Sequence, residues 1–133
     1  MCGIAGVLGG GGNAVEPAVR AMMRAMVHRG PDDEGFERFP FGDGTGHACG
    51  FGFRRLAIMD LSPLGHQPMI DPATGDAIVF NGEIYNFRKL RRKLEASGHA
   101  FRSTGDTEVL LRALTAWGER GVGAASLWTY AIG

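Results

Sequence analysis

The sequence predicts a single, turn-rich domain that mixes helices with strands. Its 133 residues fit one domain at most, and a hydrophobic fraction of 44% is enough for a packed core. Apolar residues recur with helical spacing in some stretches and form short uninterrupted runs in others. The 22 glycines are scattered between these stretches, as tight turns between short elements require.

The first part of the chain is predicted to form a strand followed by a helix. The apolar run 2–8 is typical of a short strand, and the glycine run 9–12 ends it. Pro17 is expected to open the helix, because proline suits the first turn. The expected buried face of this helix comprises Val19, Met22, Met23, Met26 and Val27.

Antiparallel strands are predicted next, over residues 36–41 and 47–53, joined by the glycine-rich turn 42–46. A third strand is expected over 56–59. Arg54 and Arg55 interrupt the apolar series between the last two. Such arginines are usually solvated, but one held near the sheet would be placed for a carboxylate.

In the next stretch, residues 71–76 have the composition of a hairpin turn leading into a strand at 77–80. Asn81-Gly82 then normally marks a tight turn between strands. No second strand is apparent after it, because a helical pattern follows instead.

Two helices are predicted in the C-terminal half. Asn86 suits the N-cap of the first and Gly98 its end, and the second runs from Gly105-Asp106 to Gly118. The basic outer face of the first helix is interpreted as solvated, since the chain has no net charge. A strand-like apolar run occupies 127–132.

Composition excludes several classes of function. Acidic and basic residues balance at 14 each, which argues against a nucleic-acid or membrane surface. Cys2 and Cys49 form no disulfide framework and no metal-binding pattern, so we expect no metal and a reducing, cytoplasmic compartment. We see neither a membrane-spanning run nor a signal peptide.

Cys2 stands where removal of Met1 would make it the N-terminal residue, with a thiol and a free α-amine together. An α-amine ordinarily has a pKa of about 8, so it can accept a proton near neutral pH. A nucleophile with a built-in base is a known catalytic arrangement. The structural alternative is a small residue that starts a strand.

Five motifs occur in order along nearly the whole chain: Met1-Cys2-Gly3-Ile4-Ala5-Gly6, His28-Arg29-Gly30-Pro31-Asp32, Arg55-Leu56-Ala57-Ile58-Met59-Asp60, Asn81-Gly82-Glu83-Ile84-Tyr85-Asn86 and Gly105-Asp106-Thr107-Glu108. Together they closely resemble the glutaminase domain of class II glutamine amidotransferases, in the asparagine synthetase branch. The resemblance implies an α+β fold, the four-layer αββα sandwich of N-terminal nucleophile hydrolases.

The resemblance also implies catalytic roles. Cys2 would attack the side-chain amide of glutamine, and its α-amine would relay the proton to the departing ammonia. The Asn81 side chain and the Gly82 N–H would stabilise the oxyanion. For the loop at His28 and Arg29 we retain the structural interpretation, a charged surface loop.

Substrate recognition is implied at five positions. Arg55 would bind the α-carboxylate of glutamine with both guanidinium N–H groups, a geometry that lysine cannot copy. Glu83 and Asp106 would receive the α-ammonium group, although Asp106 also suits a helix cap. Ile58 and Met59 complete the implied glutamine site.

The chain departs from the family at its C-terminal end. Residues 126–132 only loosely resemble the family's next strand, and the sequence lacks the ATP-binding Ser-Gly-Gly-x-Asp-Ser motif. We therefore expect a partial amidotransferase domain over 1–133, incomplete at the C-terminus. ATP and Mg²⁺ would belong only to an absent synthetase domain, which would receive the ammonia to make asparagine. The alternative is a non-catalytic glutamine-binding or interaction remnant.

Overall fold

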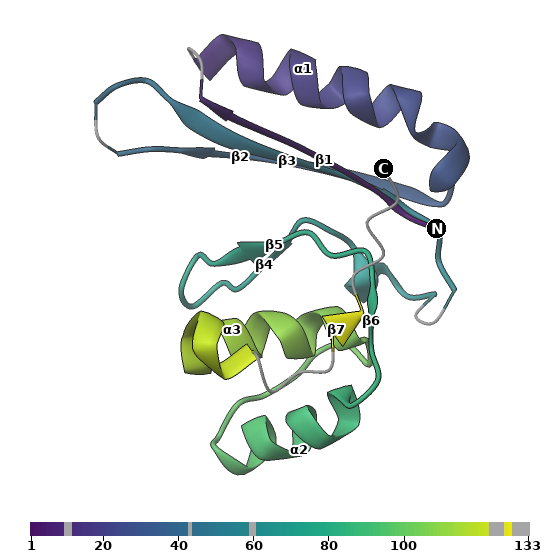
Figure 1. The fold of residues 1–133 in the computed structure, drawn as a ribbon, viewed down its shortest axis with the longest axis vertical. Coiled ribbons are helices and arrows are strands. Elements are labelled where there is room, and N and C mark those ends of the chain that lie inside the picture. The colour runs from purple at the N-terminus through teal and green to yellow at the C-terminus, as the bar shows by residue number, and fades with distance from the viewer. Residues whose placement is uncertain (10–11, 43, 59–60, 123–126, 129–133) are drawn as a thin grey trace. The chain divides into compact units, whose positions relative to one another are not determined.

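The computed structural model describes residues 1–9, 12–42, 44–58, 61–122 and 127–128 (Figure 1). The chain divides into two compact units, Met1–Ile58 with His66–Pro68 and Met59–Gly65 with Met69–Gly133. Each unit combines α-helix with antiparallel β-structure, which confirms the α+β class. Within the described parts of the chain, no helix is long and apolar enough to cross a membrane.

The first unit contains a three-stranded antiparallel sheet in the order β1-β3-β2, formed by β1 (Gly3–Gly9), β2 (Asp33–Pro40) and β3 (Ala48–Arg55). Strand β3 extends through Arg55, although the sequence predicts its end at Phe53. Arg54 remains in the sheet because its Nη1 pairs with Glu34 Oε2 on β2 at 2.6 Å. The strand predicted at 56–59 is wrong over 56–58, where the chain leaves the sheet.

Helix α1 (Gly12–Ala25) lies along one face of this sheet (Figure 1). The prediction that Pro17 opens the helix is wrong, since Pro17 lies inside it. Val15, Val19 and Met23 recur at intervals of four and are buried, so Val15 extends the apolar face one turn before Val19. Of the predicted face, Met22 and Val27 are exposed instead.

Glycine on β3 allows this close packing of helix on sheet. A Cβ atom at Gly52 would lie 2.6 Å from Met23 Sδ and from Val19 Cγ1, and one at Gly50 would lie 2.5 Å from Val15 Cγ1. Distances this short leave no room for a side chain. The small residues of β3 therefore set how near α1 approaches, and they fix the sheet that carries Cys2 and Arg55 at its end.

The second unit contains two short antiparallel pairs. Strands β4 (Met69–Ile70) and β5 (Ala77–Ile78) form a hairpin, which confirms the predicted turn between them but shortens the strand expected at 77–80. Strand β6 (Glu83–Ile84) pairs with β7 (Leu127–Trp128). The prediction that no strand follows Asn81-Gly82 is therefore wrong. The partner of β6 is distant along the chain, so local patterns give no signal for it. The remainder of the predicted 127–132 run lies outside the described residues.

Two helices complete this unit, α2 (Phe87–Ala96) and α3 (Asp106–Val122). Gly98 ends α2 as predicted, with a φ of 91°, and the bonds Gly98 N–H to Glu95 O and His99 N–H to Leu94 O, both 3.0 Å, form a Schellman motif. Gly118, with a φ of 66°, interrupts α3 at the predicted end, but helical backbone resumes beyond it.

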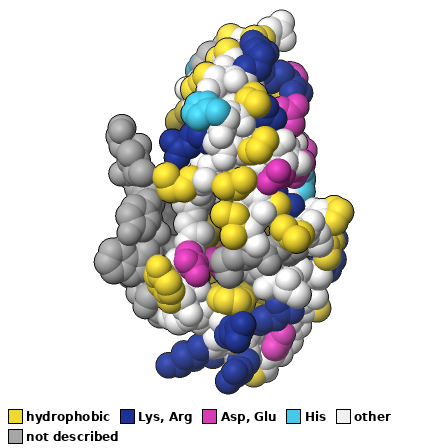
Figure 2. All heavy atoms as spheres, turned by 90° about the vertical axis from the view of Figure 1, so that its right-hand side faces the viewer, with side chains coloured by type: hydrophobic (Ala, Val, Ile, Leu, Met, Phe, Trp, Pro, Cys, Tyr) yellow, Lys and Arg dark blue, Asp and Glu magenta, His cyan; other side chains and the backbone are white. Residues whose placement is uncertain are grey.

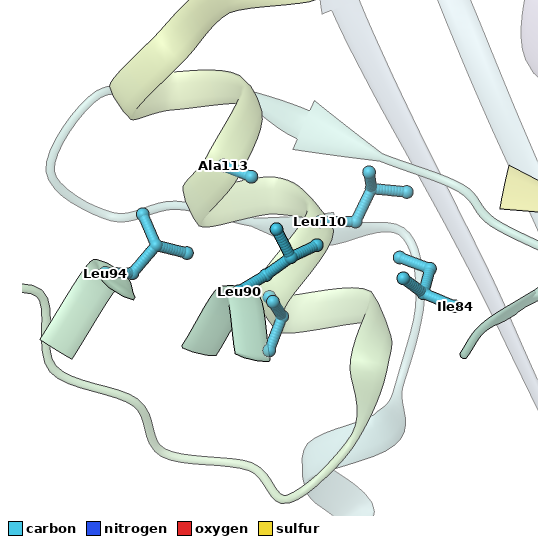
Figure 3. Close-up of a cluster of buried hydrophobic side chains, with 6 residues drawn as sticks. Ile84, Leu90, Leu94, Leu110 and Ala113 are labelled. Atoms are coloured by element: carbon cyan, nitrogen blue, oxygen red, sulfur yellow. The ribbon is translucent and has the colours of Figure 1, made fainter. Parts of the chain in front are cut away.

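The core of the second unit lies between α2, α3 and β6. The side chains of Ile84, Leu90, Leu94, Leu110 and Ala113 point toward one another there (Figure 3). The outer face of α2 exposes four basic residues, as the solvated interpretation predicts: Arg88, Lys89, Arg92 and Lys93. Figure 2 shows Lys and Arg side chains gathered in this region.

Two buried carboxylates link the loops of this unit to α3 through hydrogen bonds. Asp71 accepts hydrogen bonds from Ala73 N–H and from Arg112, and these bonds hold the pKa of its carboxyl below the ordinary value. Glu108 accepts from Arg102 N–H at 3.0 Å and from Ser103 N–H and Oγ at 2.6 Å. Burial alone would raise the pKa of Glu108, but these hydrogen bonds and the Arg112 charge outweigh it, so the pKa is lowered.

Glu108→Gln is expected to destabilise the chain by about 1–3 kcal/mol near pH 7, because the buried donors lose a charged acceptor. A folded-state pKa below the unfolded one gives stability that is present above about pH 4.3 and lost as pH falls through the folded pKa. The difference between wild type and variant should therefore shrink toward pH 3. Urea unfolding from pH 7 to pH 3 measures it.

Glu95→Gln is the matched control, since Glu95 is half-exposed in an i, i+4 pair with Arg91. It should cost less than about 0.5 kcal/mol. A Glu108→Gln cost that stays constant down to pH 3 contradicts the role given to this carboxylate.

Candidate functional site

In the first unit, the structure brings Cys2 and Arg55 together. Gly3 faces Arg54 in the β1–β3 ladder, so Cys2 and Arg55 come next at the same end of the sheet. The Cys2 thiol contacts the backbone beside Arg55: Leu56 N–H donates to Sγ at 3.3 Å, and Leu56 O accepts from Sγ at 3.7 Å. Arg55 itself is 8% exposed.

The loop before β2 packs against this end of β3. Asp32 N–H donates to Arg55 O at 3.0 Å, and Ala57 N–H donates to Asp32 Oδ2 at 2.8 Å. A Cβ atom at Gly30 would lie 2.4 Å from the carbonyl carbon of Arg54. The predicted charged surface loop is therefore fixed in place by Asp32, to which the sequence assigns no role. The available signal was Gly30-Pro31, a pair that fixes a turn.

In the second unit, the segment Asn81-Gly82-Glu83 is connected to the start of α3. Asp106 is the first residue of that helix, and its Oδ2 accepts a hydrogen bond from Ile84 N–H at 2.9 Å. Asn81 is half-buried, whereas Gly82 and Glu83 are exposed. The structure thus brings Asp106 next to the residues that follow Asn81, within the same unit.

Of the two remaining residues of the predicted glutamine site, one is exposed and the other lies outside the described residues. Ile58 is 72% exposed, in the irregular segment that follows β3. Met59 lies outside the described residues. Among the residues with described positions, no three His, Cys, Asp or Glu side chains gather where they could hold a metal ion.

The second cysteine lies at the other end of the ladder from the first. Cys49 pairs with Leu8, at the end of the β1–β3 ladder remote from Cys2. Burial raises the pKa of the Cys49 thiol, which lowers the fraction of reactive thiolate at neutral pH. Cys49 therefore serves as an internal comparison for any chemistry at Cys2.

Comparison with known proteins defines the class. A family model described as a glutamine amidotransferase domain matches residues 1–132. The chain belongs to this family, and this membership agrees with the α+β elements and with the N-terminal nucleophile hydrolase fold that the motifs imply.

The curated relatives are glutamine-hydrolysing asparagine synthetases. Asparagine synthetase [glutamine-hydrolyzing] 1 of Bacillus subtilis is 44% identical over 115 residues, covering 84% of this chain and 17% of that protein. A putative asparagine synthetase of Methanocaldococcus jannaschii is 39% identical over 127 residues, covering 84% and 23%. Asparagine synthetase 3 of Bacillus subtilis is 37% identical over 138 residues, covering 96% and 21%. The chain spans about a fifth of the length of these relatives.

Proposed function

We propose that the chain hydrolyses L-glutamine to glutamate and ammonia, with Cys2 as the nucleophile once Met1 is removed. The observation that carries the proposal is the position of Cys2 beside Arg55, at the end of one sheet. A nucleophile and a cation able to bind a carboxylate are thereby fixed on the same small framework.

In the proposed reaction, Cys2 Sγ attacks the amide carbon of glutamine while the thiol proton passes to the α-amine of Cys2. The Asn81 side-chain amide and the Gly82 N–H stabilise the negative oxygen of the tetrahedral intermediate. The α-amine then gives the proton to the leaving nitrogen, so ammonia departs and a thioester remains. Water hydrolyses the thioester, which releases glutamate and restores the thiol.

Recognition of free glutamine requires both of its charged ends. Arg55 binds the α-carboxylate, and Glu83 and Asp106 receive the α-ammonium, with Ile58 and Met59 as further contacts. Asp106 can serve the ammonium while bonded to Ile84 N–H, because a carboxylate offers about four lone-pair positions. Glutamine within a peptide lacks both free charges, which excludes it.

We further propose that the ammonia is used by a synthetase domain or subunit for ATP-dependent, Mg²⁺-dependent amidation, with asparagine as the product. This proposal is supported by the names of the relatives, which are glutamine-hydrolysing asparagine synthetases. We also propose the cytoplasm as the compartment of the reaction, because a reducing environment keeps the thiol of Cys2 free.

The free α-amine provides the decisive test. Protein with Met1 removed should release glutamate from glutamine, and the same chain with a residue retained before Cys2 should release none, because its base is then an amide nitrogen. Glutamate is measured by coupled assay, and thermal unfolding confirms that both forms fold. Equal activity with a blocked N-terminus contradicts the mechanism. Glutamine binding without turnover in calorimetry indicates the non-catalytic alternative.

A further inference from the structure

Asp32 and Cys2 contact the same two peptide groups from opposite ends. The peptide between Arg55 and Leu56 accepts from Asp32 N–H at 3.0 Å and donates its own N–H to Cys2 Sγ at 3.3 Å. The peptide between Leu56 and Ala57 donates its N–H to Asp32 Oδ2 at 2.8 Å, and its carbonyl accepts from Cys2 Sγ at 3.7 Å. Leu56 is thus held between the aspartate and the thiol.

These contacts reinforce one another. A hydrogen bond at one end of a peptide group polarises it and strengthens the bond at the other end. The contact from Leu56 N–H to Sγ is the shorter of the two. The orientation of Leu56 therefore affects where Sγ is held.

We propose that Asp32 is a positioning residue for the nucleophile, acting through the backbone of Leu56. Its carboxylate fixes the Leu56–Ala57 peptide, and this peptide with its neighbour holds Cys2 Sγ at the end of β1. The inference rests on the proposed role of Cys2. It gives the loop before β2 a part in the reaction without contact between that carboxylate and substrate.

The neighbouring carboxylate provides a matched control. Asp33 Oδ1 accepts from Glu34 N–H at 2.9 Å, and Asp33 Oδ2 pairs with His66 Nδ1 at 2.8 Å. Asp33→Asn should leave the behaviour of Cys2 unchanged. Asp32 is exposed, so a longer side chain at that position has room in solvent and the fold should tolerate it.

The test compares Asp32→Asn with Asp32→Glu. Asparagine keeps an acceptor oxygen in place without the charge, whereas glutamate keeps the charge and displaces the oxygen by one methylene. Two quantities are measured: glutamine hydrolysis, and alkylation of Cys2 by iodoacetamide without glutamine in a Cys49→Ala background. Thermal unfolding confirms that each variant folds.

We expect Asp32→Asn to stay within about twofold of wild type in both rates. Asp32→Glu should lower kcat and the alkylation rate by about fivefold to tenfold, with KM for glutamine changed less than about twofold. Full retention by Asp32→Glu, or an equal loss in Asp32→Asn, overturns the proposal. Wild-type protein without glutamine hydrolysis contradicts the proposed function instead, and the alkylation rates still test positioning.

Discussion

Cys2→Ala is expected to lower glutamine hydrolysis by about a thousandfold or more, to the level of the uncatalysed background. The loss follows from the proposed mechanism, because no thioester can form without Sγ and the α-amine then has no thiol proton to relay. Glutamate release under saturating glutamine measures the effect. Calorimetry should show that the variant still binds glutamine, since Arg55 and the carboxylates that receive the ammonium are unchanged.

Cys49→Ala is the matched control for this loss. Its thiol lies at the other end of the β1–β3 ladder, and burial raises its pKa. Its removal should leave kcat within about twofold, since exchange of a half-buried thiol for a methyl group changes little beyond local packing. If Cys2→Ala retains activity while Cys49→Ala loses it, the nucleophile has been wrongly assigned.

Asn81→Ala should lower kcat by about 100-fold to 1,000-fold, corresponding to about 3–4 kcal/mol of lost transition-state stabilisation. The proposed amide donor interacts with oxygen only after it becomes negative. Both kcat and kcat/KM are therefore expected to fall together, with KM nearly unchanged. Steady-state kinetics with glutamine measure the split between them.

Asn86→Ala is the control, because it removes the same side chain at the N-cap position of α2, five residues along the chain. It should leave kcat within about twofold, since no role in the reaction is proposed for Asn86; although Asn86 occupies the N-cap position as predicted, its side chain makes no capping hydrogen bond to α2. A large rise in KM for Asn81→Ala with kcat unchanged contradicts the oxyanion role and indicates ground-state binding of glutamine.

The sequence predicts which helices and strands form better than it predicts where each begins and ends. The apolar spacing predicts helix α1 but not its start, because Pro17 suggests a first turn whereas the buried Val15 lies two residues before it. The predicted end of strand β3 is too early, because Arg54 and Arg55 interrupt the apolar series. A cross-strand ion pair and burial keep them in the sheet, and neither interaction is visible from local composition.

The candidate site contains residues that the sequence predicts and one whose contacts appear only in the folded chain. Arg55 and Asp106 were predicted from motifs, and the structure adds how each is held: Arg55 beside the thiol, and Asp106 by Ile84 N–H. The sequence assigns no role to Asp32, because its contacts are to backbone atoms more than twenty residues away. Side-chain chemistry can be inferred from residue type, whereas backbone recognition depends on a close approach that only the folded chain defines.

The most direct test of the central claim is covalent trapping of the nucleophile. Protein with Met1 removed is treated with a glutamine analogue that carries a diazoketone in place of the side-chain amide, and the product is mapped by mass spectrometry. We predict one adduct per chain on Cys2, prevented by excess glutamine and absent when a residue precedes Cys2. Labelling of Cys49, or glutamate release from glutamine by protein whose Cys2 cannot be labelled, would contradict it.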